Sequence, residues 1–201
     1  MLHQLIQYLN PEFLIKTFGY LGIFFIVFAE SGLFFGFFLP GDSLLVTAGL
    51  FAAKGELNIA LLVALCIIGA ILGDTVGFTF GKKTGERFLK KDDPKIIKAK
   101  SFYDKHGGKT IILARFMPFV RTFAPIIAGA AEMHYPTFLS FNLIGGTVWG
   151  ALMPLLGYFL GKSLPADKLD KYFMIIVGAI IFLSVLPPVI EYAKHRFHTN
   201  R

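Results

Sequence analysis

The chain has 201 residues, of which 55% are hydrophobic and 23 are phenylalanine, and it carries a formal net charge of +7. Long, nearly uncharged stretches of this composition exclude a soluble globular domain and predict an integral membrane protein. The single cysteine, Cys66, excludes an intramolecular disulfide, and the chain begins without the basic region and cleavage site of a signal peptide. We therefore expect one membrane domain over residues 1–201, kept whole.

Five apolar runs predict the helical elements, and three of them have the length of one membrane crossing: 57–81, 137–161 and 172–190. The run 18–53 is too long for one crossing, and the sequence FLPGDSL breaks it near its middle. The run 110–131 holds two arginines and two prolines, which prevent a single clean helix. Irregular backbone at membrane depth is tolerated only inside protein or beside a wet cavity, so both broken runs predict re-entrant segments. A full crossing by part of the first run stays open.

Residues 82–109 form a basic stretch that holds ten of the twenty lysines and arginines, against four acids. Membrane segments flank this stretch, which favours a cytoplasmic loop by the positive-inside rule over a nucleic-acid site. Its sequence DPKIIKAKSFYDKHG has apolar residues placed among lysines, a pattern typical of a short amphipathic helix on an anionic leaflet.

The sequence also contains a weak internal repeat. At an offset of 80, Ala48-Gly49 falls on Ala128-Gly129, Gly77 on Gly157 and Gly81-Lys82 on Gly161-Lys162; at an offset of 85, Glu30 falls on Arg115. Each unit would be one broken segment followed by one crossing helix, which gives the two units opposite orientations. The predicted fold is therefore an all-α membrane protein: an inverted repeat of re-entrant hairpin plus transmembrane helix, with one further transmembrane helix at the C-terminus.

Five ionisable residues lie within or beside the apolar runs: Glu30, Asp42, Asp74, Arg115 and Arg121. An arginine at the bilayer centre costs about 2.5–3.5 kcal/mol on insertion scales, so we expect these groups to be paired. The first broken segment supplies two acids and the second supplies two arginines, which predicts opposite charges facing each other where the segments meet. For Asp74 we expect a place near the membrane surface or a pairing with a lysine such as Lys82. Asn142 and Trp149 are expected to serve helix packing or interface anchoring.

This set of groups predicts transport rather than bond breaking. Arg115 and Arg121 are the candidate anion-binding residues, because a guanidinium binds phosphate or carboxylate through paired hydrogen bonds. Glu30 and Asp42, and more weakly Asp74, are the candidate proton-coupling residues, because a low-dielectric site favours the neutral carboxyl group. A carboxyl group that takes up a proton would free its arginine to hold an anion. Static ion pairs that only pin the segments together are the structural alternative.

Two motifs carry a family resemblance. FAESGLFFGFFLPGDSLLVTAG, followed by HGGKTIILARFMPFVRTFAPIIAG, resembles the DedA family of bacterial membrane proteins, whose domain is shared with eukaryotic lipid scramblases. The resemblance covers nearly the whole chain and places Glu30, Asp42, Arg115 and Arg121 where the family has its essential membrane acids and arginines. It implies two facing re-entrant hairpins and proton-dependent translocation of a lipid such as undecaprenyl phosphate or phosphatidylethanolamine. The sequence PGD departs from the Pro-x-Pro-Gly-Glu form of many relatives, which leaves the cargo open.

The leading hypothesis is thus a lipid flippase or scramblase of the bacterial cytoplasmic (inner) membrane, which the chain would cross several times. A proton-coupled transporter of small ions, an intramembrane lipid phosphatase and an assembly factor are the alternatives. The histidines lie outside the broken segments and no H-E-x-x-H, G-x-S-x-G or paired-cysteine pattern occurs, so no enzymatic activity, catalytic residue, metal or cofactor is expected. The expected partners are the bilayer, protons and a phospholipid or polyprenyl phosphate. The sequence leaves the oligomeric state open, a homo-oligomer included.

Overall fold

The computed structural model describes residues 11–33, 41–88, 101 and 108–163. Six helices make up this part of the chain: α2 (Pro11–Gly32), α3 (Gly41–Ala53), α4 (Ile59–Phe88), α6 (Lys109–Ala114), α7 (Pro118–Ala130) and α8 (Tyr135–Ser163). The fold is all-helical over these residues, as the sequence predicts. Two of the helices, Ile59–Gly85 within α4 and Tyr135–Ser163, are long and apolar enough to cross a membrane.

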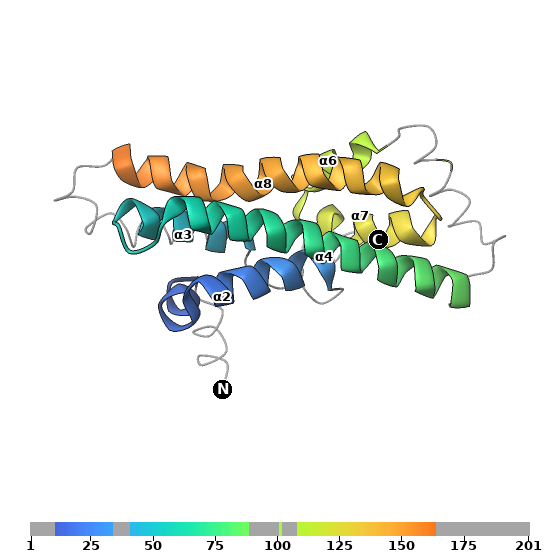
Figure 1. The fold of residues 1–201 in the computed structure, drawn as a ribbon, viewed down its shortest axis with the longest axis horizontal. Coiled ribbons are helices and arrows are strands. Elements are labelled where there is room, and N and C mark those ends of the chain that lie inside the picture. The colour runs from blue at the N-terminus through green and yellow to red at the C-terminus, as the bar shows by residue number, and fades with distance from the viewer. Residues whose placement is uncertain (1–10, 34–40, 89–100, 102–107, 164–201) are drawn as a thin grey trace, which may run out of the picture.

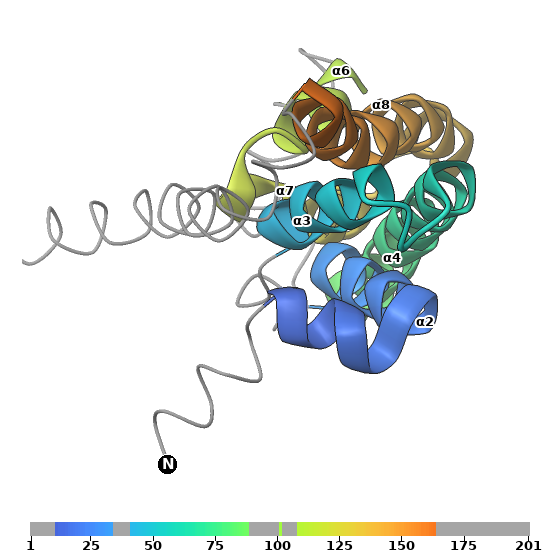
Figure 2. The ribbon, with the colours of Figure 1, turned by 90° about the vertical axis from the view of Figure 1, so that its left-hand side faces the viewer.

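The two long helices α4 and α8 lie side by side and run in opposite directions (Figure 1). The shorter α3 and α7 both begin near the middle of the molecule and lead towards opposite ends of it. Seen end-on, α2 and α8 lie on opposite sides with α3 and α4 between them (Figure 2). The first turns of α3 and α7 therefore meet about halfway along the long helices.

The described residues combine buried charged groups with an apolar outer surface, which is unusual for a soluble protein. Charged and amide side chains are buried, among them Glu30, Asp74, Arg115, Arg121 and Asn142. Large apolar side chains instead lie on the outer faces of the long helices: Leu61, Ile68, Leu72, Val76, Phe80, Leu143, Ile144, Val148, Leu152, Leu156, Phe159 and Leu160. A surface of this kind is stable against lipid tails and costly in water, so the outer faces of α4 and α8 fit a bilayer.

Glycines at every fourth position let the backbone of α4 contact its neighbours directly. In the N-terminal half of this row, Gly73 faces the carbonyl oxygen of Phe28 on α2. In the C-terminal half, a Cβ at Gly81 would lie 2.0 Å from the carbonyl oxygen of Ile126 on α7, so only glycine fits there. Small residues are typical of helix contacts in membranes, because packing there depends on close approach rather than on water exclusion. One helix thus supports both α2 and α7.

The helix α8 supports α3 in the same way. A Cβ at Gly157 would lie 2.0 Å from the carbonyl oxygen of Val46 on α3, and a Cβ at Gly49 would lie 2.0 Å from the carbonyl oxygen of Pro154. On the other long helix, Gly129 of α7 faces the carbonyl oxygen of Phe78 at the same distance. The contacts between α3 and α8 therefore resemble those between α7 and α4.

Several element boundaries differ from the predicted ones. The helix α4 continues beyond residue 81 to Phe88. The charged residues of this stretch are good helix formers, and no proline lies between residue 81 and Pro94. Residues 82–88 are therefore helix rather than loop. The first broken run begins earlier than residue 18, since α2 starts at Pro11 and bends at Gly19, whose φ is 54°.

The second broken run is divided once, before Pro118. The helix α6 ends at Ala114, Met117 is extended with φ −111° and ψ 107°, and Pro118 is the first residue of α7. A residue before proline prefers this extended conformation, so Pro118 fixes the break. Pro125 lies inside α7 without ending it, although it removes the amide that would bind the carbonyl group of Arg121. The predicted crossing helix 172–190 lies outside the described residues. Of the basic stretch 82–109, which contains the predicted amphipathic helix, the structure describes residues 82–88, 101, 108 and 109.

The glycine contacts make a specific prediction about stability. Gly81→Ala should lower the free energy of unfolding by about 1–3 kcal/mol, because its Cβ would meet the backbone of α7, which cannot yield without moving the helix. Thermal unfolding in detergent, followed by fluorescence-detected size exclusion, measures the effect.

Gly77→Ala is the matched control on the same face of α4. The nearest atom to its Cβ would be 3.4 Å away, which is ordinary van der Waals contact, so its stability should stay close to that of the wild type. Equal losses in both variants would contradict the backbone packing described here.

Candidate functional site

Arg121 lies at the place where α3 and α7 meet, and it binds two carboxyl groups at once. Its Nη1 donates to Oδ1 of Asp42 over 2.6 Å, and its Nη2 donates to Oε1 of Glu30. Trp149 of α8 completes the group: its indole nitrogen donates to the same Oδ1 of Asp42 over 3.0 Å, and its ring centroid lies 4.8 Å from the guanidinium carbon. We name these four residues the Arg121 centre.

The local structure explains why these residues meet. Asp42 belongs to the first turn of α3 and Arg121 to the first turn of α7, and each first turn follows a proline or includes one. A carboxylate is favoured at a helix N-terminus, whereas a cation there opposes the helix dipole. Two carboxyl groups beside Arg121 offset this unfavourable position.

Glu30 reaches the centre from the last turn of α2. The hydroxyl group of Thr122 donates to its backbone carbonyl group over 3.2 Å, which ties α2 to α7. A Cβ at Gly41 would lie 1.3 Å from Oε2 of Glu30, so only glycine lets this carboxyl group reach the start of α3. Oε2 is buried and has no hydrogen-bond partner among the described residues. The centre therefore has unused hydrogen-bonding capacity inside the protein.

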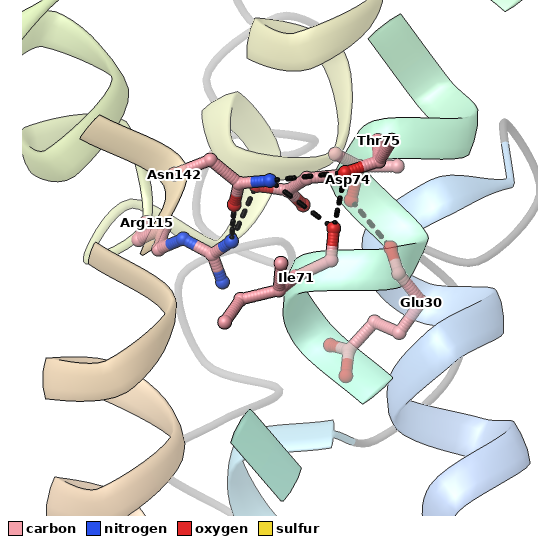
Figure 3. A network of polar contacts seen from close by, with 7 residues as sticks. Glu30, Ile71, Asp74, Thr75, Arg115 and Asn142 are labelled. Carbon is pink, nitrogen blue, oxygen red and sulfur yellow. Dashed lines mark hydrogen bonds and ion pairs between the residues drawn. The ribbon is translucent and has the colours of Figure 1, made fainter. Parts of the chain in front are cut away.

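Arg115 lies at the break between α6 and α7 and belongs to a separate group, shown in Figure 3. Its Nη2 donates to Oδ2 of Asp74 on α4 over 2.5 Å and to Oδ1 of Asn142 on α8 over 2.5 Å. Asn142 donates in turn to the carbonyl oxygen of Ile71 over 3.1 Å and lies within 3.4 Å of the hydroxyl group of Thr75. We name Asp74, Arg115 and Asn142 the Arg115 centre. It joins both long helices to the break.

The two centres differ in exposure. The side chains of Arg115 and Asp74 are each 4% exposed, whereas that of Asp42 is 30% exposed, although Arg121 beside it is 8% exposed. The Arg121 centre is thus open on the side of Asp42. Within the described part of the chain, no three His, Cys, Asp or Glu residues are placed to hold a metal ion.

The pairing of charges differs from the predicted one in one respect. Glu30 and Asp42 both pair with Arg121, and Arg115 pairs with Asp74. The expectation that Asp74 lies near the membrane surface or pairs with a lysine is wrong. Asp74 is buried halfway along α4, where Arg115 is the cation that reaches it, while Lys82 is exposed two turns further on.

Sequence reasoning assigned Asn142 and Trp149 to packing or anchoring, and the structure places each in one of the two centres. A signal was present: Asn142, Gly145, Gly146 and Trp149 have the spacing of one helix face, with small residues between two polar groups. A face of this kind predicts close contact with polar side chains of other helices.

Comparison with known proteins identifies the family of this chain. The VTT domain family matches residues 39–161. The chain is 46% identical over 182 residues to Protein DedA of Escherichia coli K12, which covers 87% of this chain and 82% of that protein. It is 42% identical over 182 residues to the uncharacterized membrane protein ML0287 of Mycobacterium leprae, covering 87% and 79% of the two chains. The inner membrane protein YqjA of E. coli K12 is 35% identical over 150 residues, covering 72% and 68%.

The chain belongs to the DedA family. The family match and the apolar outer faces of the long helices agree that this is a membrane protein. No solved structure matches the chain.

The Arg115 centre can be tested by breaking and then removing its ion pair. Asp74→Ala should lower the free energy of unfolding by about 3–5 kcal/mol, because it leaves the buried charge of Arg115 unpaired. The double variant Asp74→Ala with Arg115→Leu removes both charges and should recover most of this loss. Thermal unfolding in detergent measures both variants.

Glu56→Gln is the control, because it removes an exposed carboxylate from the α3–α4 loop. A double variant as unstable as Asp74→Ala alone would show that the ion pair is not what holds these helices together.

Proposed function

We propose that this DedA-family protein moves a phosphate-bearing lipid, such as undecaprenyl phosphate or phosphatidylethanolamine, across the bacterial cytoplasmic membrane with proton coupling. The observation that carries the proposal is Arg121, a permanently charged group halfway along the membrane domain whose two terminal nitrogens are both held by carboxyl groups. A lipid phosphate and a carboxylate compete for the same guanidinium donors.

The chemistry of the guanidinium group favours phosphate as cargo. Its planar fork binds two oxygens of one phosphate group through parallel hydrogen bonds, and it keeps its charge in every protein environment. The lipid tail needs no site of its own, since the apolar outer faces of the helices allow it to stay in the bilayer while only the headgroup enters.

Protons would decide when Arg121 is available. While Glu30 and Asp42 are ionised, they occupy both nitrogens, and the three side chains together carry a net charge of −1, which repels an anion. A carboxyl group that takes up a proton weakens its bond to Arg121 and removes this repulsion. Proton binding and phosphate binding then favour each other, which is a coupling of two equilibria.

Arg115 is the second proposed phosphate-binding residue, and Asp74 controls it in the same manner. Because Asp74 and Asn142 both hold Arg115, it would reach the cargo only after Asp74 becomes neutral. The Arg115 centre is less exposed than the Arg121 centre, so the headgroup would reach Arg121 first and Arg115 second.

The packing supports an inverted repeat of two re-entrant hairpins, α2–α3 and α6–α7. Gly157 of α8 packs on Val46 of α3, and Gly81 of α4 packs on Ile126 of α7. The short helices therefore correspond at an offset of 80 residues, from Val46 to Ile126. The long helices correspond at an offset of 76 residues, from Gly81 to Gly157. The offset of 80 predicted for α3 and α7 thus fits the contacts, while the long helices are shifted by one turn. Hairpins that enter from opposite sides offer the cargo site to each leaflet in turn.

The proposed topology places the end of α4 at the cytoplasmic side and the α3–α4 loop outside. In a chain whose Cys66 is replaced by Ala, Glu56→Cys and Lys83→Cys should react with a membrane-impermeant maleimide from opposite sides of intact cells and inverted vesicles. Both native side chains are exposed, so both cysteines are accessible. Labelling of both from one side would contradict the crossing by α4.

Lipid movement itself is measured in proteoliposomes. Fluorescent polyprenyl phosphate or phosphatidylethanolamine should change leaflets faster with the wild-type protein than without it, and faster at lower pH, because neutral carboxyl groups release Arg121. Arg121→Ala should slow this movement by about tenfold or more, the expected loss of a charge-assisted hydrogen bond. The double variant Glu30→Gln with Asp42→Asn should lose most of the pH dependence, because both groups beside Arg121 are then neutral at every pH.

Lys83→Gln is the control, since it removes a positive charge that is exposed at the end of α4. Unchanged movement in Arg121→Ala would contradict the role of this residue. A flux of protons or small ions that does not depend on the lipid headgroup would favour the alternative, a proton-coupled transporter of small ions.

A further inference from the structure

Trp149 is the one tryptophan of the chain, and it is 1% exposed in the middle of the protein. Its indole N–H and Nη1 of Arg121 both donate to one atom, Oδ1 of Asp42, over 3.0 and 2.6 Å. The guanidinium carbon of Arg121 lies over its ring, 4.8 Å from the ring centroid, which is the arrangement of a cation–π contact. Two N–H donors from two helices thus converge on a single oxygen position.

We propose that this convergence point is the seat of a phosphate oxygen and that Trp149 is a cargo-binding residue, with Asp42 occupying the seat while no cargo is bound. The proposal rests on the proposed function and adds a second ligand and a defined position to it. A carboxylate oxygen and a phosphate oxygen are both anionic acceptors, so each satisfies the two donors in the same way.

The difference between the two acids identifies which of them leaves. The side chain of Asp42 is 30% exposed, whereas that of Glu30 is 3% exposed and is confined by Gly41 at the start of α3. Asp42 therefore has space to turn outward, and Glu30 does not. When Asp42 leaves, the indole N–H and Nη1 of Arg121 lose their acceptor together, and an unpaired buried donor is costly. An incoming phosphate oxygen removes this cost.

The contact between the ring and the guanidinium group gives Trp149 a second effect on the cargo. It limits the movement of the Arg121 side chain, which keeps the nitrogens near their positions when Asp42 leaves. A preorganised donor pair binds more tightly than one that must be ordered on binding. The removal of the N–H group and the removal of the ring should therefore weaken binding in separable steps.

The intrinsic fluorescence of the protein reports on this site directly, because Trp149 is its one source of indole emission. Addition of a short-chain polyprenyl phosphate to the full-length protein in detergent should give a saturable change in emission. The uncharged polyprenol of the same length should not. The change should be absent in Arg121→Gln, in which the indole remains but the cation is gone.

The variants of Trp149 test its role through binding and transport. Trp149→Phe keeps a ring over the guanidinium group and removes the N–H donor, so the dissociation constant for polyprenyl phosphate should rise by about tenfold or more. Trp149→Leu removes both contributions and should bind more weakly still. In the proteoliposome assay, both variants should need higher cargo concentrations for half-maximal rate, with a smaller effect on the maximal rate.

Phe138→Leu is the matched control, because Phe138 is a fully buried aromatic residue of the same helix that stacks on Phe78, with ring centroids 4.3 Å apart. It should lower thermal stability and leave the affinity for polyprenyl phosphate unchanged. A thermal unfolding measurement on each variant separates loss of fold from loss of binding.

The outcomes distinguish this inference from the proposed function. Wild-type binding affinity in Trp149→Phe, or no emission change with a cargo that the wild-type protein does move, overturns the role of Trp149 and leaves lipid transport standing. A saturable, Arg121-dependent emission change in a protein that moves no lipid supports the phosphate seat and contradicts lipid transport. An equal response to inorganic phosphate supports the seat and contradicts a lipid cargo.

Discussion

The structure depends on ion pairs buried inside a protein whose outer surface is apolar. Two arginines halfway across a membrane domain are each too costly to leave alone, since insertion scales place the cost at about 2.5–3.5 kcal/mol per residue. Three carboxyl groups from three other helices offset this cost, and they can do so only where helices start, end or break close to one another. The broken helices and the charged residues are therefore two parts of one solution. Each break lies next to one of these charges, Asp42 after the first and Arg115 at the second.

The two arginines share a chemistry and differ in their surroundings. Arg121 lies between carboxyl groups of two short helices and beneath an indole ring, and one of its partners is partly exposed. Arg115 lies between the two long helices and is held by an aspartate and an asparagine that are both closely packed. The first group has a partner that is partly exposed, while the second joins both long helices to the break between α6 and α7. In the proposed transport both groups would release their arginine in turn, the partly exposed group first.

The sequence predicted the long helices, the broken runs and the burial of opposite charges, because each depends on a strong local signal. Proline before Gly41 and at position 118 marks a break, and charges in an apolar run demand partners. The pairing of those charges was harder to predict, since it depends on which faces of the helices meet. Asp74 has Lys82 two turns away in its own helix, yet the packing of α8 and of the break against α4 brings Arg115 to Asp74 instead. Trp149 is predicted to serve packing when it is considered alone, and its polar role becomes predictable only from the helix face that it shares with Asn142, Gly145 and Gly146.

The glycine row of α4 has a mechanical consequence. Where side chains interlock, a helix can shift against its neighbour only if many rotamers change together, and this makes the contact stiff. A row of glycines presents a smoother surface, so a neighbouring helix can shift along it by a small distance with few side chains in the way. In this protein the N-terminal half of the row faces α2 and the C-terminal half faces α7. The long helix can therefore serve as a common track for two elements, and small sliding movements of α2 and α7 along it are coupled by the bonds of Arg121 and Thr122 to Glu30.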